Sequence, residues 1–153
     1  MSVPAEMLAT ARDLAAGDRA ALATLDWAGW PYVSLVLVAQ DKPGLPLLLL
    51  SDLAEHTKNI RREARASLLF DGTAGMAEPL SGPRLTLMGL VEFAGEEEAL
   101  TRYIGRHPGA ATWAAMRDFR LYRLVPVRGH LVAGFGRIAW IEAHALFSGL
   151  RSS

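Results

Sequence analysis

Cysteine is absent from the 153-residue chain. The sequence therefore excludes disulfide bonds, thiolate metal sites and a cysteine nucleophile. A chain without cysteine fits the reducing cytosol, so we expect a cytoplasmic protein. Histidine is scarce as well. The four histidines show neither an HxxxH spacing nor a pairing with carboxylates, so we expect no metal site.

Net charge and long apolar runs are also lacking. Lys+Arg and Asp+Glu each number 16, so the formal net charge is zero, whereas a general nucleic-acid binder would be basic. No apolar run is long enough to cross a membrane, and residues 1–16 lack the basic start and apolar centre of a signal peptide. We therefore expect no nucleic-acid partner and no membrane partner.

The periodic segments predict a single domain over residues 1–153. Helical spacing of apolar residues predicts helices at residues 7–15, 53–63, 96–107, 110–116 and within 142–150. Strands are predicted at residues 20–25, 31–39, 45–51, 66–71, 84–93, 118–127 and 131–141. The last two strands are expected to form a hairpin around Arg128-Gly129-His130. This order indicates a mostly β fold, a small β-barrel with peripheral helices.

Two local signals add detail to this prediction. Residues 41–44, Asp-Lys-Pro-Gly, predict a turn that joins two antiparallel strands. Gly89 lies inside a predicted strand and is typical of a bulge or a bend at a barrel corner.

The junction between residues 45–51 and the following helix is the most informative stretch. An apolar run ends at Ser51, and Asp52 with Glu55 has the spacing of a capping box. The unpaired N–H groups and the dipole of such a helix start favour an anion. The side chains available to cradle a phosphate are Ser51, His56, Thr57 and Lys58. The alternative interpretation is an ordinary capped helix with a solvated basic face.

Several motifs, in a fixed order, resemble one superfamily. Gly29-Trp30-Pro31-Tyr32-Val33-Ser34 resembles the G-x-P-x-x-S opening of the second strand in the pyridoxamine-5′-phosphate-oxidase-like FMN-binding split barrels. Within that superfamily, the sequence most resembles the haem-utilisation branch. The other stretches that carry the resemblance are residues 51–59, 66–70 and 84–89, and the ending that contains Asp118-Phe119, Gly134-Phe135-Gly136 and Trp140.

The resemblance implies a split β-barrel that forms a homodimer with FMN in a cleft between the subunits. The cofactor-binding residues that it implies are Ser34, Ser51, His56, Thr57, Lys58, Arg84 and Thr86. Ser34 and Ser51 correspond to contacts with the flavin chain, residues 56–58 to the phosphate site, and Arg84 and Thr86 to the strand beside the ring. Gly136-Arg137-Ile138 lacks the histidine of the substrate-binding Arg-x-His pattern, so oxidation of pyridoxamine phosphate is not expected.

The predicted function is that of an FMN-binding flavoprotein, an oxidoreductase related to pyridoxamine 5′-phosphate oxidase. The sequence identifies neither a substrate nor a catalytic acid or base. One alternative is a haem-binding or haem-degrading protein that uses the same cleft. The resemblance places an axial histidine in the C-terminal region, which makes His130 and His144 candidates. Another alternative is a non-catalytic dimer that binds a ligand.

Composition favours a dimer independently of the resemblance. The chain is 51% hydrophobic and its mean hydropathy is +0.18. A barrel of this size leaves apolar strand faces uncovered, and large apolar patches mark interfaces. The large side chains expected in the core or at an interface are Trp27, Trp30, Trp113 and Trp140.

Overall fold

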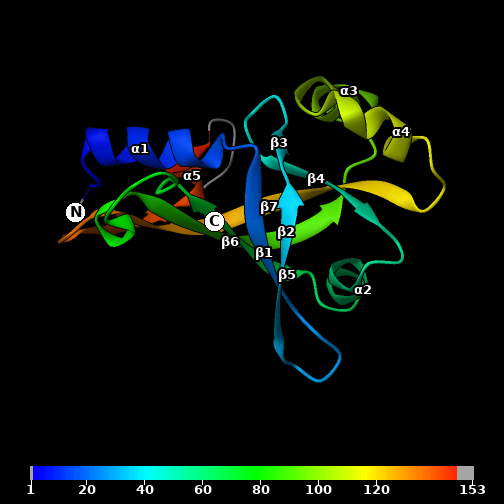
Figure 1. Ribbon diagram of the computed structural model, residues 1–153, viewed down its shortest axis with the longest axis horizontal. Coiled ribbons are helices and arrows are strands. Elements are labelled where there is room, and N and C mark those ends of the chain that lie inside the picture. The colour runs from blue at the N-terminus through cyan, green and yellow to red at the C-terminus, as the bar shows by residue number, and fades with distance from the viewer. Residues whose placement is uncertain (1, 148–153) are drawn as a thin grey trace.

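The computed structural model describes residues 2–147, and its main feature is an antiparallel sheet that curls into an open barrel (Figure 1). The strands are β1 (Arg19–Leu25), β2 (Pro31–Leu37), β3 (Ala39–Gln40), β4 (Pro46–Ser51), β5 (Arg65–Asp71), β6 (Arg84–Phe93), β7 (Phe119–Gly134) and β8 (Arg137–Glu142). The α-helices are α1 (Ala5–Ala15), α2 (Glu55–Arg62), α3 (Glu97–Arg106), α4 (Ala111–Ala114) and α5 (Ala143–Leu146). Short 3₁₀ turns lie at η1 (Pro79–Ser81) and η2 (Pro108–Ala110). The prediction of a mostly β fold with peripheral helices is confirmed.

The sheet is not closed. Its strand order is β2-β1-β5-β6-β7-β4-β3, with β8 paired to β7, and β2 is therefore at one end. The short β3 pairs with β4 only at Pro46 and Leu47, so the rest of β4 has a free edge. The curl brings β2 into contact with β4, but no ladder pairing joins these two strands in the described part of the chain. The barrel is split at this point.

The core fills the inside of the curl. Alternate residues of the strands face inward, and Leu22, Leu68, Leu87, Leu124 and Leu131 are fully buried. Helix α1 covers one end of this core through Met7, Ala11 and Ala15. A smaller cluster lies under α3 and contains Ala39, Leu47, Ala99, Tyr103 and Leu121.

The closing hairpin differs from its prediction. Strand β7 continues through Arg128-Gly129-His130, and the turn lies at Phe135-Gly136, where Gly136 has φ 72°. The predicted turn at 128–130 was wrong because this segment is paired on both sides: Met88 of β6 lies opposite Arg128, and so does Glu142 of β8. Pairing with two neighbours overrides a local turn signal that would decide an isolated segment.

Other local predictions can be compared directly. The turn at residues 41–44 is confirmed: Gly44 has φ 102°, and Asp41 Oδ1 accepts hydrogen bonds from the amides of Gly44 (3.0 Å) and Leu45 (2.8 Å). The helix expected within 142–150 is α5, and residues 148–150 lie outside the described residues. All four tryptophans are at least half exposed, so none lies in the core of the chain, and their expected place at an interface stays a prediction.

No helix in the described part of the chain has both the length and the apolar character needed to span a membrane.

Gly89 lies at a point of β6 where the neighbouring strand leaves no room for a side chain. The register between β6 and β7 shifts between Met88 and Gly89, which confirms the predicted bulge. A Cβ at this position would collide with the backbone of Val125 and Pro126. Backbone atoms cannot move aside as a flexible side chain can, so the close pairing at the bulge requires glycine.

We expect Gly89→Ala to lower the free energy of unfolding by about 1–3 kcal/mol, because overpacking forces the two strands apart. The control is Gly105→Ala in α3, where nothing lies within 4 Å of the added Cβ. This control should be neutral or stabilising by about 0.5–1 kcal/mol. Urea unfolding measures both, and equal stability of the two variants would contradict the bulge argument.

Candidate functional site

The split between β2 and β4 opens into a cleft of about 710 Å³. Its walls are the facing edges of the two strands, the start of α2 and the segment that runs from α3 to α4. The lining residues are Leu35, Val36, Leu37, Leu49, Leu50, Ser51, His56, Tyr103, Arg106, His107, Pro108, Gly109, Ala110, Trp113 and Phe119. Most of these side chains are apolar or aromatic, so the cleft is suited to a flat, largely apolar ligand.

His56 stands in the wall of the cleft, in the first turn of α2. Its Nδ1 lies 2.9 Å from Ser34 Oγ, and Ser34 belongs to the inward-facing row of β2. Burial lowers the pKa of His56 below its ordinary value near 6.5, because an imidazolium loses hydration there. The ring is therefore neutral near pH 7, with one nitrogen engaged by a hydroxyl.

The start of α2 differs from the predicted capping box. The helix begins at Glu55 after Ala54, and no side chain caps it. Asp52 is instead engaged by two guanidinium groups, those of Arg61 (3.1 Å) and Arg120 (3.2 Å to each carboxylate oxygen). The capping-box prediction was wrong because tertiary ion pairs recruit Asp52 away from the helix start.

Ser51 closes the turn between β4 and α2. Its hydroxyl donates to Asp118 Oδ2 at 3.0 Å and accepts from the amide of Leu53 at 3.1 Å. The first bond ties the end of β4 to the segment that precedes β7, and the second holds the turn that follows β4. Ser51 therefore lines the cleft with its hydroxyl already engaged on both sides.

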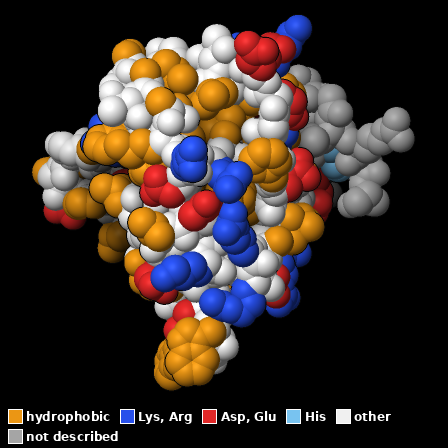
Figure 2. Space-filling view, turned by 90° about the vertical axis from the view of Figure 1, so that its right-hand side faces the viewer, with side chains coloured by type: hydrophobic (Ala, Val, Ile, Leu, Met, Phe, Trp, Pro, Cys, Tyr) orange, Lys and Arg blue, Asp and Glu red, His pale blue; other side chains and the backbone are white. Residues whose placement is uncertain are grey.

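Thr57 and Lys58 lie away from the cleft lining. Thr57 is fully buried, and its hydroxyl has no hydrogen-bond partner among the described residues. Lys58 is exposed, and its Nζ lies 3.4 Å from Glu55. Figure 2 shows the side of the molecule on which α2 lies, where Lys and Arg side chains are interleaved with Asp and Glu. Of the four side chains proposed for a phosphate cradle, only Ser51 and His56 line the cleft.

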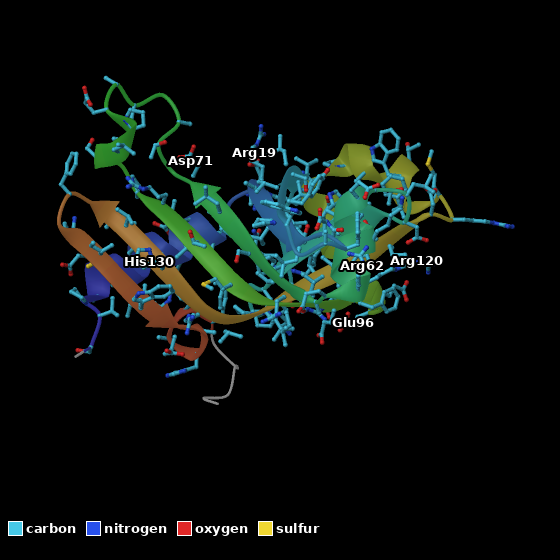
Figure 3. The ribbon with its side chains drawn as sticks, turned by 90° about the horizontal axis from the view of Figure 1, so that it is seen from below. Arg19, Arg62, Asp71, Glu96, Arg120 and His130 are labelled. Carbon is cyan, nitrogen blue, oxygen red and sulfur yellow. The ribbon has the colours of Figure 1, made fainter. Side chains whose placement is uncertain are left out.

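Arg84 and Thr86 lie elsewhere in the same chain. Both are on β6, where Arg84 pairs with Asp71 and Thr86 pairs with His130. Figure 3 shows Asp71 and His130 near one end of the molecule and Arg62 and Arg120 near the other. Arg84 and Thr86 border a separate hollow of about 370 Å³. Within one chain, Arg84 and Thr86 line a different hollow from His56, so their role in cofactor binding stays a prediction.

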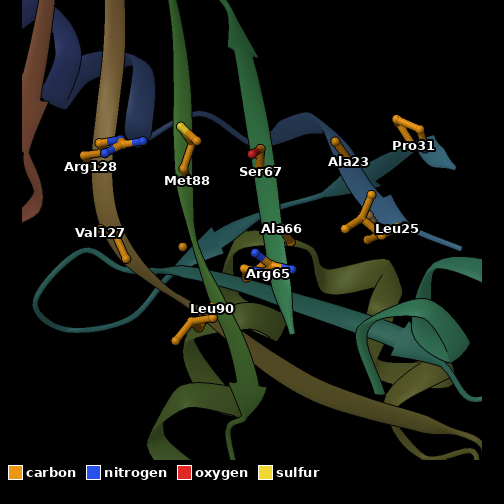
Figure 4. Close-up of a pocket in the computed structure, with 12 residues that line it drawn as sticks. Ala23, Leu25, Pro31, Arg65, Ala66, Ser67, Met88, Leu90, Val127 and Arg128 are labelled. Carbon is orange, nitrogen blue, oxygen red and sulfur yellow. The ribbon is translucent and has the colours of Figure 1, made fainter. Parts of the chain in front are cut away.

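A third hollow, of about 480 Å³, lies on the outer face of the sheet (Figure 4). Its floor is mostly apolar, with Leu25, Met88, Leu90 and Val127 from the three strands β1, β6 and β7. Arg65 and Arg128 stand at its margin, and the guanidinium of Arg128 lies over the ring of Trp140, 5.0 Å from its centre. This face carries exposed apolar side chains that none of the described residues covers.

The α3–α4 segment supplies cleft residues that sequence reasoning did not assign to a site. His107 Nε2 lies 2.7 Å from the carbonyl of Val38, and the Tyr103 hydroxyl donates to the carbonyl of Leu37 at 3.5 Å. Leu37 is the last residue of β2, and Val38 follows it directly. The only signal in the sequence was the apolar stripe of the helix, which does not reveal what the helix covers.

The geometry can now be compared with known proteins. A family model described as "CREG, beta-barrel" matches residues 4–148. The chain belongs to the CREG β-barrel family. This membership and the relatives below confirm the resemblance to the haem-utilisation branch of the pyridoxamine-phosphate-oxidase-like split barrels.

Relatives of this chain include proteins whose names mention haem. It is 35% identical over 109 residues to "Non-canonical heme oxygenase HOZ, chloroplastic" of Arabidopsis thaliana, which covers 69% of this chain and 33% of that protein. The chain thus matches about a third of the length of this relative. A "heme binding protein from Mycobacterium smegmatis" has a TM-score of 0.83 at 28% identity, covering 95% of this chain and 61% of that one.

A solved structure with lower sequence identity has the same fold. A pyridoxinephosphate oxidase family protein from Clostridium acetobutylicum, related to general stress protein 26, has a TM-score of 0.72 at 11% identity, covering 94% of this chain and 99% of that one. At this identity the likeness shows the fold alone. The CREG β-barrel chain is therefore a split barrel of the pyridoxamine-phosphate-oxidase type.

The lowered pKa of His56 predicts a pH effect on stability. Because the folded protein binds a proton at His56 less readily than the unfolded chain does, stability should fall as the pH drops below about 6.5. His56→Asn removes this titration. Urea unfolding at about pH 7.5 and 5.5, which bracket an ordinary histidine pKa, should show a larger loss at low pH for the parent chain than for the variant. Equal losses would contradict the burial of a neutral His56.

Proposed function

We propose that this domain binds haem in the cleft between β2 and β4. The observation that carries the proposal is the cleft itself: it is large, mostly apolar, bordered by Trp113 and Phe119, and open beside a half-buried imidazole. Haem supplies an iron that takes axial protein ligands and changes its oxidation state. The haem-named relatives at 35% and 28% identity support the same ligand.

The charges around the cleft fit the two carboxylates of haem. Arg106 lines the cleft, and its guanidinium donates to Gln40 Oε1 (3.2 Å) and to the carbonyl of Ala16 (3.1 Å). Both acceptors are neutral, and Arg106 has no hydrogen bond to a carboxylate among the described residues, although the hydrogen bond from Arg19 and, to a smaller extent, the charge of Arg106 lower the pKa of Asp18. A guanidinium that has no hydrogen-bonded carboxylate can pair with a haem propionate at the mouth of the cleft.

FMN is the second candidate, favoured by the uncapped start of α2 beside the cleft. Unpaired helix amides favour a phosphate, and the split-barrel fold is shared with the pyridoxinephosphate oxidase family. Cations are sparse at this point, however, because Lys58 is exposed and lies against Glu55. A phosphate dianion would therefore find few charged partners, and we place haem ahead of FMN.

We also propose that the domain works as a homodimer through the outer face of the sheet. Exposed apolar side chains on this face include Val33, Leu35, Leu69, Leu90, Ile138 and Trp140. The pairing register places Leu35, Leu69 and Trp140 in one row across six strands. An isologous contact between two copies is the commonest way to cover such a face.

Haemin should bind the purified protein with one-to-one stoichiometry. Absorbance and the quenching of tryptophan fluorescence measure this binding. Trp113→Ala should weaken binding by about 1 kcal/mol, roughly fivefold in Kd, through loss of an aromatic contact. Trp27→Ala is the control, since Trp27 is 81% exposed and lies outside the cleft lining. FMN and riboflavin are titrated in parallel. Tight FMN binding with weak riboflavin and haemin binding would overturn the haem proposal and support FMN.

For the dimer, light scattering should report twice the 16.6 kDa mass of the chain. Leu69→Glu should shift the protein to monomer, because a charge would be buried against the second copy. The control is Leu53→Glu, at a residue that is 76% exposed and precedes α2, off this face. A monomeric parent protein at micromolar concentration would exclude the dimer.

A further inference from the structure

We propose that His56 is the iron ligand in this cleft, with Ser34 as the residue that positions its ring; this inference rests on the proposed haem function. The imidazole is part of the cleft wall, and Ser34 Oγ lies 2.9 Å from Nδ1. Nε2 has no hydrogen bond to any described residue and is the nitrogen left to bind a metal. A serine hydroxyl can accept from Nδ1–H, and that tautomer leaves the lone pair on Nε2.

A hydrogen bond to the second ring nitrogen is the usual support of a metal-binding histidine. It fixes the ring orientation and the tautomer, and it raises the basicity of the ligating nitrogen. Here the support comes from β2, a strand of the rigid sheet, while the imidazole comes from α2. The two residues are 22 positions apart in the sequence, and the fold alone brings them together.

The backbone of α2 is held independently of the histidine. Asn59 Nδ2 donates to Thr24 Oγ1 of β1 at 3.0 Å, and both side chains are buried. Ile60, on the same helix, is part of the hydrophobic core. The first turn of α2 therefore has a fixed place beside the cleft, as a metal ligand requires.

The other three histidines are less suited to this role. His107 also lines the cleft, but its Nε2 lies 2.7 Å from the carbonyl of Val38 and its ring packs against Tyr103. Breaking that bond would take this partner from the carbonyl of Val38, the residue that directly follows β2. His130 borders the separate hollow near Arg84 and stacks on Trp140, with ring centres 4.6 Å apart. His144 is exposed on α5 and lines none of the hollows described above.

The test is a haemin titration of the full chain, read by absorption and electron paramagnetic resonance of the ferric complex rather than by activity. We expect His56→Gly to lose the histidine-ligated spectrum and to raise the Kd for haemin at least tenfold. Added imidazole should restore the spectrum, which also shows that the variant is folded. His144→Ala removes an exposed histidine and should leave spectrum and affinity unchanged.

Ser34 is tested as a positioning residue by its effect on the same spectrum. Ser34→Ala should keep a histidine ligand but broaden the ferric signal and weaken haemin binding roughly tenfold, the lower end for loss of such a support. Ser34→Thr keeps the hydroxyl and should restore both. An unchanged spectrum and affinity in Ser34→Ala would overturn the positioning role.

The outcomes separate the ligand assignment from the function. If His56→Gly binds haemin with parental spectrum and affinity, the assignment of His56 is wrong while haem binding stands. If that spectrum is lost in His107→Ala instead, His107 is the ligand and our assignment is overturned. If the parent protein takes up no haemin at all, the proposed function itself fails, and the inference fails with it.

Discussion

The structure depends on a sheet that curls but does not close. Eight strands could form a barrel without edges, yet β2 and the outer half of β4 meet with no ladder between them. Unpaired backbone groups along such edges need partners. Side chains of the α3–α4 segment supply some of them, since Tyr103 and His107 bond to carbonyls of residues 37 and 38. The cleft is the space that this incomplete closure leaves.

A polar cluster around Arg123 supports the wall of the cleft on the side of α3. On the side of α3, Arg123 bonds to Asp41 at 2.7 Å and to Glu96 at 3.0 Å, joining β7, the 41–44 turn and the residue before the helix. The side chains of Arg123 and Asp41 are only 13% and 8% exposed. Removing one partner of such a pair would leave a buried charge uncompensated. The cleft is thus built on rigid elements.

Much of the sheet could be predicted from local patterns, because strand composition and turn residues act over a few positions. The 41–44 turn is an example: Asp41 and Gly44 make it from their own side chain and backbone freedom. The turn at 128–130 and the cap at Asp52 were predicted wrongly, because partners distant in the sequence decide both. The pairing of Ser34 with His56 depends on the curl of the whole sheet, and no local pattern reports it.

The distribution of charge is the reason why we propose haem ahead of FMN. The cations of α2 lie on an exposed face beside carboxylates, as Lys58 does with Glu55 and Arg61 with Asp52. Exposed pairs of this kind contribute about 0–1 kcal/mol each, and their cations are not free to concentrate on a phosphate. Apolar burial contributes about 2.5 kcal/mol for each 100 Å² withdrawn from water.

A ligand that gains its affinity mainly by burying a flat apolar ring is therefore better matched to this cleft than one held by its phosphate. The position of Arg106 in the cleft lining supports the same ligand. A single guanidinium with neutral acceptors, beside leucine and tryptophan side chains, suits a ligand whose charges are few and lie at its rim. Ser34 holds His56 in the wall of the cleft, and burial lowers the pKa of its imidazole, so the proposed ligand would meet a neutral ring there.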